Sequence, residues 1–183
     1  MKKFLIALII LLPLVALAQT GNATAKDIKV EIIDLEPFSI AGLHLMSRDI
    51  TGDEVSQFWK VYKEKEKTYK ADSKVTWGAK FNIKEHDGTT FFNYLVGKDV
   101  TGETDIPGKY RQMNVPTNKY ALFVHKGTIV STAKTYDYIY NTWFKQNSYI
   151  LNTKAAILEK EIISEDGENI EIHIYIPITP QEK

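Results

Sequence analysis

STAKTYDYIYNTWFKQNS, residues 131–148, has the pattern of an amphipathic helix, and the expected architecture follows from what surrounds it. Its apolar side chains recur at spacings of three and four residues: Tyr136, Ile139, Tyr140, Trp143 and Phe144. A helix with a single apolar face needs a sheet to cover that face. The flanking segments read as strands, with residues 110–127 before the helix and residues 155–164 and 170–178 after it.

The first half of the chain repeats this order. Residues 28–48 alternate in polarity, which predicts a strand pair or one long bent strand. Residues 51–67 switch to helical spacing behind a Thr51–Glu54 capping box. Strands at 77–88 and 90–100 are joined by Asp87-Gly88, a tight-turn signal. We therefore expect an α+β fold in which duplicated β-α-β-β units form one curved antiparallel sheet, with two helices on one side and a ligand cleft on the other.

The first 18 residues have the composition of a secretory signal peptide. Lys2 and Lys3 precede an apolar run, and Ala16-Leu17-Ala18 fits a cleavage site. The alternative, an uncleaved membrane anchor, fits less well because the run is short and is interrupted by Pro13. The predicted organisation is a signal peptide (1–18), a lead-in (19–27) and one domain (28–180). Cleavage after Ala18 implies a periplasmic or secreted protein without a stable membrane anchor.

Charge and cysteine content exclude several classes of function. Loss of Lys2 and Lys3 leaves 21 basic against 23 acidic residues, so no global basic field would hold nucleic acid. The chain contains no cysteine, which excludes disulfides, thiolate metal ligands and a cysteine nucleophile. Neither a metal nor another cofactor is expected, because the four histidines occur singly and form no HxH or HExxH motif.

Several segments in order resemble the GyrI-like small-molecule-binding family, which includes the effector-binding domains of AraC-type transcription activators. They are VEIIDLEPFSIAGL (30–43), GDEVSQFWKVY (52–62), GKYRQMNVPTNKYALFVHKG (108–127), YIYNTWF (138–144), ILEKEI (157–162) and IHIYIPI (172–178). The resemblance covers residues 28–178. It implies a ligand cleft between the halves that takes large aromatic, often cationic compounds. The signal peptide and the lack of a helix-turn-helix segment depart from the regulators of the family.

The resemblance also implies a cleft glutamate in the penultimate strand, which falls on Glu159. The family usually has an aromatic residue where this chain has Glu161, and a shifted register would give Glu161 the role. Both carboxylates project from the same face by strand alternation. A carboxylate among apolar groups favours a cationic guest, and aromatic rings strengthen that preference. The alternative is that both glutamates are solvated charges at a strand edge.

Four aromatic residues are further candidates for lining the cleft. Trp77 and Tyr94 resemble cleft positions of the family, although either could simply pack within the sheet. Trp143 lies near the end of its helix and could reach the cleft rim, whereas Trp59 has core spacing. Phe123 is a candidate because the strand at 118–127 must turn one of its faces toward the cleft, and the sequence does not say which.

The expected function is an exported, multidrug-type binding protein for aromatic, cationic or amphipathic compounds. The main alternative is a hydrolase of reactive aromatic compounds in which Glu159 is the general base and Tyr94 the proton donor. Haem binding is a more distant alternative, because the related SOUL-type proteins share a similar duplicated fold. A protein partner that reads out ligand binding stays open as well.

Overall fold

A computed structural model describes residues 28–66, 75–164, 167 and 169–181 of the chain. The predicted signal peptide and lead-in, residues 1–27, lie outside the described residues. Within the described part, no helix is long and apolar enough to cross a membrane.

The first half has the predicted order of elements. Two strands precede the first helix, so the run at 28–48 is not one long bent strand, although its two strands do not pair with each other. The elements are β1 (Val30–Leu35), β2 (Phe38–Asp49), α1 (Gly52–Glu66), β3 (Thr76–His86) and β4 (Thr89–Asp99). The capping box is formed: the Thr51 backbone N–H donates to Glu54 at 3.0 Å, and the Glu54 N–H donates to the Thr51 hydroxyl at 3.3 Å. Asp87 and Gly88 both have positive φ, as a two-residue hairpin loop requires.

The second half repeats the pattern with a more irregular helix. The strands are β5 (Arg111–Val115), β6 (Asn118–Lys126), β7 (Tyr149–Leu151), β8 (Ile157–Ile163) and β9 (Ile170–Pro180). The helical segment consists of η2 (Ile129–Ser131), α2 (Ala133–Tyr138), the π-helical turn η3 (Ile139–Trp143) and α3 (Phe144–Gln146). Ile139 and Trp143 are buried as predicted, while Tyr140 is 40% exposed.

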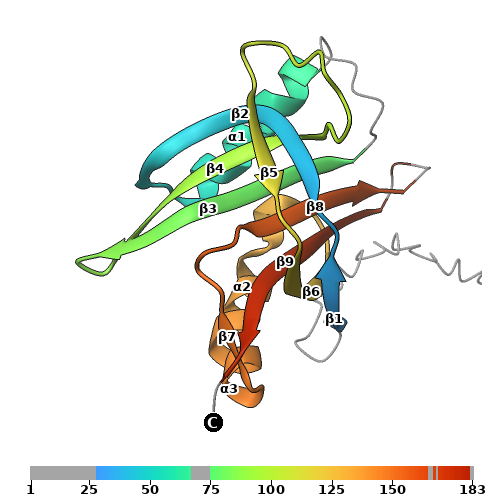
Figure 1. The fold of residues 1–183 in the computed structure, drawn as a ribbon. Helices are drawn as coiled ribbons and strands as arrows, with labels where there is room; N and C mark the ends of the chain where they lie inside the picture. The colour runs from blue at the N-terminus through green and yellow to red at the C-terminus, as the bar shows by residue number, and fades with distance from the viewer. Residues whose placement is uncertain (1–27, 67–74, 165–166, 168, 182–183) are drawn as a thin grey trace, which may run out of the picture.

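The two halves form one curved antiparallel sheet in the order β1-β6-β9-β8-β3-β4-β2-β5 (Figure 1). The β3–β8 pairing joins them at the centre of the sheet. Each half also lends an edge strand to the other, since β1 pairs with β6 and β5 pairs with β2. This exchange was not predicted, and it ties the halves together at both edges of the sheet.

Both helices cover the same face of the sheet, as expected, and lie behind it in Figure 1. The core on this face contains Trp59 and Tyr62 of α1, Ile139 and Trp143 of the second helical segment, and inward side chains of the central strands. A second cluster occupies the helix-free face and includes Trp77, Leu95, Tyr120, Leu158 and Tyr175. The duplicated α+β architecture inferred from the sequence is therefore confirmed.

Candidate functional site

A buried carboxylate, that of Glu159, lies at the centre of the helix-bearing face. Its side chain is 4% exposed, and each of its oxygens accepts a hydrogen bond from a tyrosine. The Tyr136 hydroxyl donates to Oε1 at 2.6 Å, and the Tyr94 hydroxyl donates to Oε2. The Trp59 indole N–H donates in turn to the Tyr94 oxygen at 2.8 Å. We call these four residues the carboxylate site.

The junction between the halves positions this site. Glu159 of β8 pairs with Gly78 of β3, and Tyr94 of β4 pairs with Lys80 of β3. Tyr94 reaches Glu159 across Gly78, where a Cβ atom would lie 2.5 Å from the Tyr94 hydroxyl and 3.0 Å from Glu159 Oε2. Glycine at position 78 therefore provides the space for this hydrogen bond.

The same arrangement draws on both halves of the chain. Tyr94 and Trp59 come from β4 and α1 in the first half, while Glu159 and Tyr136 come from β8 and α2 in the second. The site thus lies between the two β-α-β-β units.

Both tyrosines act as neutral donors. Burial raises the pKa of the Tyr94 hydroxyl well above its ordinary value, and the charge of Glu159 raises it further. Burial and the same carboxylate raise the pKa of Tyr136. Neutral donors satisfy the oxygens of Glu159 without neutralising its negative charge. The site therefore combines satisfied hydrogen bonding with a focused negative potential among aromatic rings.

The raised pKa values make protein stability sensitive to alkaline pH. In the unfolded chain these tyrosines ionise near pH 10, whereas in the folded protein they keep their protons. Their contribution to stability is complete below about pH 10 and is lost above it, by up to about 1.4 kcal/mol per pH unit for each hydroxyl. Urea unfolding at increasing pH should show this decline, and Tyr94→Phe or Tyr136→Phe should make it shallower. An ultraviolet absorbance titration in which all ten tyrosines of the folded protein ionise near pH 10 would contradict the raised pKa values of Tyr94 and Tyr136.

Glu161 shares the face of Glu159 but has a different partner. The two residues alternate along β8, as predicted, and Glu161 is 5% exposed. Its Oε1 lies 2.5 Å from the ammonium of Lys63 on α1. Of the two candidate carboxylates, Glu161 is thus engaged by a lysine, and Glu159 is held by uncharged tyrosines.

The other predicted lining residues lie elsewhere. Trp77 precedes Gly78 in β3, so it points to the opposite face from Glu159 and packs against Phe38 and Tyr175. Phe123 is fully buried in the helix-side core, where its ring lies 5.3 Å from that of Trp143. Trp143 also stacks on Tyr149. Of the predicted set, the structure brings together Glu159 and Tyr94, with Glu161 next to them on the same face.

Sequence reasoning missed three residues in or next to the carboxylate site. Tyr136 was assigned only to the apolar face of its helix, and Trp59 only to the core. The third is Lys80, which lies two residues after Gly78, on the same face of β3. Its ammonium lies 4.6 Å from the centre of the Phe92 ring and 5.2 Å from that of Tyr136. The one sequence signal for Lys80 is strand alternation, which places residues 78 and 80 on the same face of β3.

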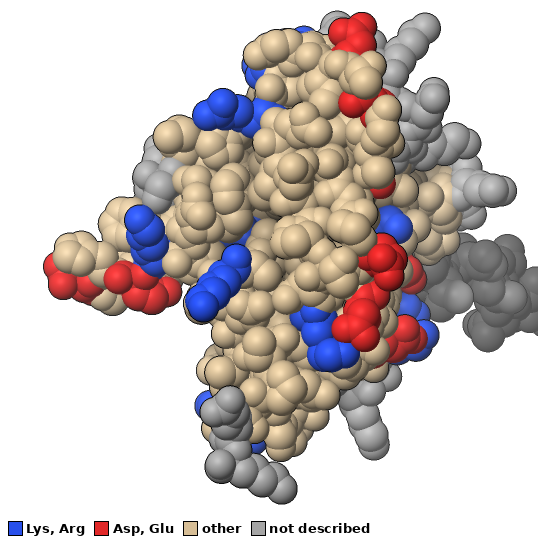
Figure 2. Space-filling view, in the orientation of Figure 1, with Lys and Arg blue, Asp and Glu red and all other residues tan. Residues whose placement is uncertain are grey.

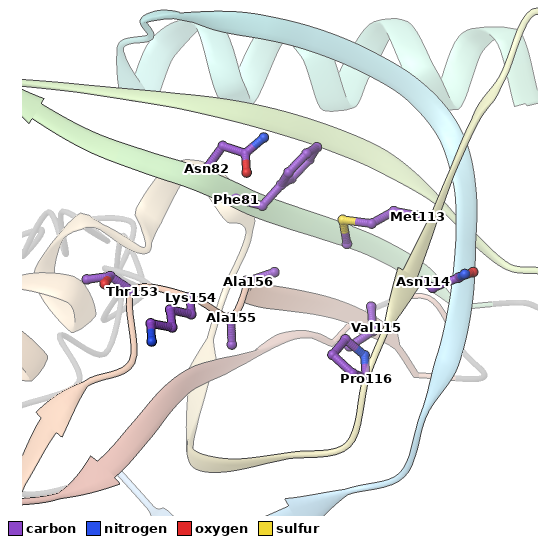
Figure 3. A pocket seen from close by; sticks show the side chains of 10 residues that line it. All are labelled: Phe81, Asn82, Met113, Asn114, Val115, Pro116, Thr153, Lys154, Ala155 and Ala156. Atoms are coloured by element: carbon purple, nitrogen blue, oxygen red, sulfur yellow. The ribbon is translucent and has the colours of Figure 1, made fainter.

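The helix-free face contains a separate pocket of about 450 Å³. Figure 3 shows Phe81 and Met113 on one side of it and the segment from Thr153 to Ala156 on the other. A cleft on this side was expected, but the expectation that it holds the glutamate needs correction. Glu159 bonds to a tyrosine on α2, so its carboxylate faces the helices, not this pocket. Which face of the sheet holds the carboxylate depends on the side where the helices pack. Alternation within β8 shows only which of its residues share a face, and not which face the helices cover.

The histidines in the described part of the chain do not assemble into a metal site. Both ring nitrogens of His125 lie 2.8 Å from hydroxyls, those of Thr135 and Ser131. His44 stacks on Phe81, with 5.8 Å between the ring centres. Within residues 28–66, 75–164, 167 and 169–181, no three His, Cys, Asp or Glu side chains are grouped to hold an ion.

Comparison with known proteins points to one family. Residues 28–179 match the GyrI-like small molecule binding domain. The transcriptional regulator BrlR of Pseudomonas aeruginosa is 26% identical over 168 residues, which cover 88% of this chain and 60% of BrlR. The chain thus spans less than two thirds of that regulator.

Two solved structures share the fold at low sequence identity. An integron cassette protein from Vibrio cholerae, VCH_CASS2, has a TM-score of 0.54 and 17% identity, and the match covers 84% of this chain and 99% of that one. SAV2435, solved bound to tetraphenylphosphonium, has a TM-score of 0.58 and 15% identity, with coverages of 82% and 94%. The family match spans nearly the whole described chain, and the protein belongs to the GyrI-like small molecule binding domain family.

Proposed function

We propose that this protein binds aromatic compounds, preferentially cationic or amphipathic ones, at the carboxylate site. The observation that carries the proposal is Glu159, a 4% exposed carboxylate whose two hydrogen-bond donors are neutral hydroxyls. A buried carboxylate attracts a cation strongly, because little water screens the interaction. The binding of tetraphenylphosphonium, an aromatic cation, by the structural neighbour SAV2435 supports this choice.

The aromatic rings near the carboxylate favour a planar ligand. Tyr136 stacks on Tyr140 with 6.2 Å between ring centres and an angle of 12°, and Tyr140 stacks on Phe144 at 6.0 Å. Since Tyr140 is 40% exposed, this row of rings runs from the buried carboxylate to the surface. Stacking and cation–π contact along such a row each add about 0.5–2 kcal/mol.

The hydrolase alternative fits the geometry less well. A general base must accept a proton from the substrate or from water, and each oxygen of Glu159 already accepts a tyrosine hydrogen bond, which leaves only its remaining lone pairs for that proton. Tyr94, the supposed proton donor, directs its own proton at Glu159. This arrangement favours binding without turnover.

Export and independence from nucleic acid are further parts of the proposal. The sequence of residues 1–18 supports secretion into the periplasm or medium, and an exported protein whose first residue is not Gln19 would argue against the cleavage site. The near-neutral charge supports a role without nucleic acid. Figure 2 shows positive and negative side chains interspersed around one face, without a continuous basic stripe.

A fluorescence titration with a matched pair of ligands tests the binding proposal. N-Methylacridinium is a permanent cation, and acridine, above its own titration range, is a neutral molecule of nearly the same shape. We expect saturable quenching of tryptophan by both after inner-filter correction, with tighter binding of the cation by roughly 10-fold or more. Equal affinity for the two would refute cation selection. Conversion of a ligand beyond one equivalent would favour the hydrolase.

A further inference from the structure

The residue that stands out beyond the carboxylate site is Lys80, because it places a cation where the proposed ligand's charge would go. Lys80 is partly buried and shares the helix-bearing face with Gly78 and Thr76. Its ammonium lies over two rings, 4.6 Å from the centre of Phe92 and 5.2 Å from that of Tyr136. An ammonium over aromatic faces is the arrangement by which proteins bind organic cations.

The connection between Lys80 and Glu159 is both geometric and electrostatic. Tyr136, one of the rings beneath the ammonium, donates its hydroxyl to Glu159 Oε1 at 2.6 Å. Lys80 pairs across β3–β4 with Tyr94, the other donor to Glu159. Burial lowers the pKa of Lys80, and the charge of Glu159 opposes that change, so the lysine lies within the field of the carboxylate.

Another lysine, Lys63, lies over a different ring of the carboxylate site, that of Trp59. The Lys63 ammonium lies 5.9 Å from the centre of the Trp59 ring and is 2.5 Å from Glu161. Its charge is therefore matched by its own carboxylate. Lys80 differs because one ring beneath it, Tyr136, donates a hydrogen bond to Glu159, the carboxylate that we assign to the ligand.

We propose that Lys80 is an internal competitor, a tethered cation that occupies the rings beside Glu159 and that a cationic ligand must displace. This inference rests on the proposed function and specifies its selectivity. The lysine weakens the binding of all cations by a similar factor, so that only ligands with enough aromatic area to offset the displacement bind well. Neutral aromatic ligands lose less, because they do not compete for the carboxylate.

Replacing the ammonium tests the inference. Lys80→Met removes the charge and keeps an apolar chain of similar length. Lys80→Gln removes the charge and keeps a polar group at the end of the side chain. Lys84→Met is the matched control, since it removes a lysine from an exposed position of the same strand. Calorimetric titration of each variant with N-methylacridinium and acridine, with circular dichroism to verify folding, gives the affinities.

We expect Lys80→Met and Lys80→Gln to bind N-methylacridinium at least 10-fold more tightly than the parent protein, and acridine within about 3-fold. Lys84→Met should bind both as the parent does. Unchanged or weaker cation binding in the folded Lys80 variants would overturn the inference while leaving the proposed function in place. Absence of saturable binding of either ligand to the parent and to every variant would overturn both.

Discussion

Gly78→Ala should lower the free energy of unfolding by about 1–3 kcal/mol and weaken ligand binding at the carboxylate site. The added methyl would lie 2.5 Å from the Tyr94 hydroxyl, 2.8 Å from Cζ2 of Trp59 and 3.0 Å from Glu159 Oε2. The Trp59 and Tyr94 side chains are almost fully buried, so they have little room to move. The strand would have to shift, or the Tyr94–Glu159 hydrogen bond would have to lengthen.

Urea unfolding measures this effect, and Gly108→Ala is its control. A methyl group added at position 108 would meet no heavy atom within 4 Å, so this substitution should change stability by no more than about 0.5 kcal/mol. A double-mutant cycle with Tyr94→Phe identifies the cause, because that change removes the closest atom. The cost of Gly78→Ala should fall by about 1 kcal/mol in the Tyr94→Phe background. The same cost in both backgrounds would show that the hydroxyl is not what the methyl meets.

Much of the fold could be predicted because its signals are local. The 3.6-residue period of α1, the capping box at Thr51 and the Asp87-Gly88 turn depend on neighbours in the sequence, and each is present in the structure. The order of strands depends on contacts between distant segments. For this reason the exchange of β1 and β5 between the halves could not be predicted from the periodicity of either strand.

In the candidate site, too, the features set by one strand could be predicted, and the contacts between distant segments could not. Strand alternation correctly placed Glu159 and Glu161 on one face, because it is a property of β8 alone. Whether Trp77 or Lys80 accompanies them depends on the register between β3 and β8, which sets Gly78 opposite Glu159. Tyr136 reaches the carboxylate from α2, and only the packing of that helix on the sheet determines this contact.

Glu159→Gln should reduce the affinity for N-methylacridinium by roughly 10- to 100-fold, which corresponds to about 1.4–2.8 kcal/mol. Glutamine keeps the size of the side chain and removes its charge. Its amide nitrogen cannot accept a hydrogen bond, so either Tyr94 or Tyr136 must also lose its present acceptor. The affinity for acridine should change by no more than about threefold, because no ionic attraction is lost.

Two comparisons separate the charge of Glu159 from general effects. Glu161→Gln removes a carboxylate from the same strand and face, and the Lys63 ammonium that it leaves is 40% exposed, so water can solvate its charge and cation affinity should stay within about threefold of the parent value. In the Lys80→Met background the loss caused by Glu159→Gln should be larger, because Lys80 no longer shares the attraction of the carboxylate.

The central claim is that the charge of Glu159 selects the ligand, and one calorimetric series tests it most directly. The ratio of the N-methylacridinium and acridine dissociation constants is measured for the parent protein, Glu159→Gln and Glu161→Gln. We predict that the preference for the cation falls at least 10-fold in Glu159→Gln and persists in Glu161→Gln. A preference that survives in folded Glu159→Gln, or that is lost equally in both variants, would contradict the assignment of Glu159 as the selecting carboxylate.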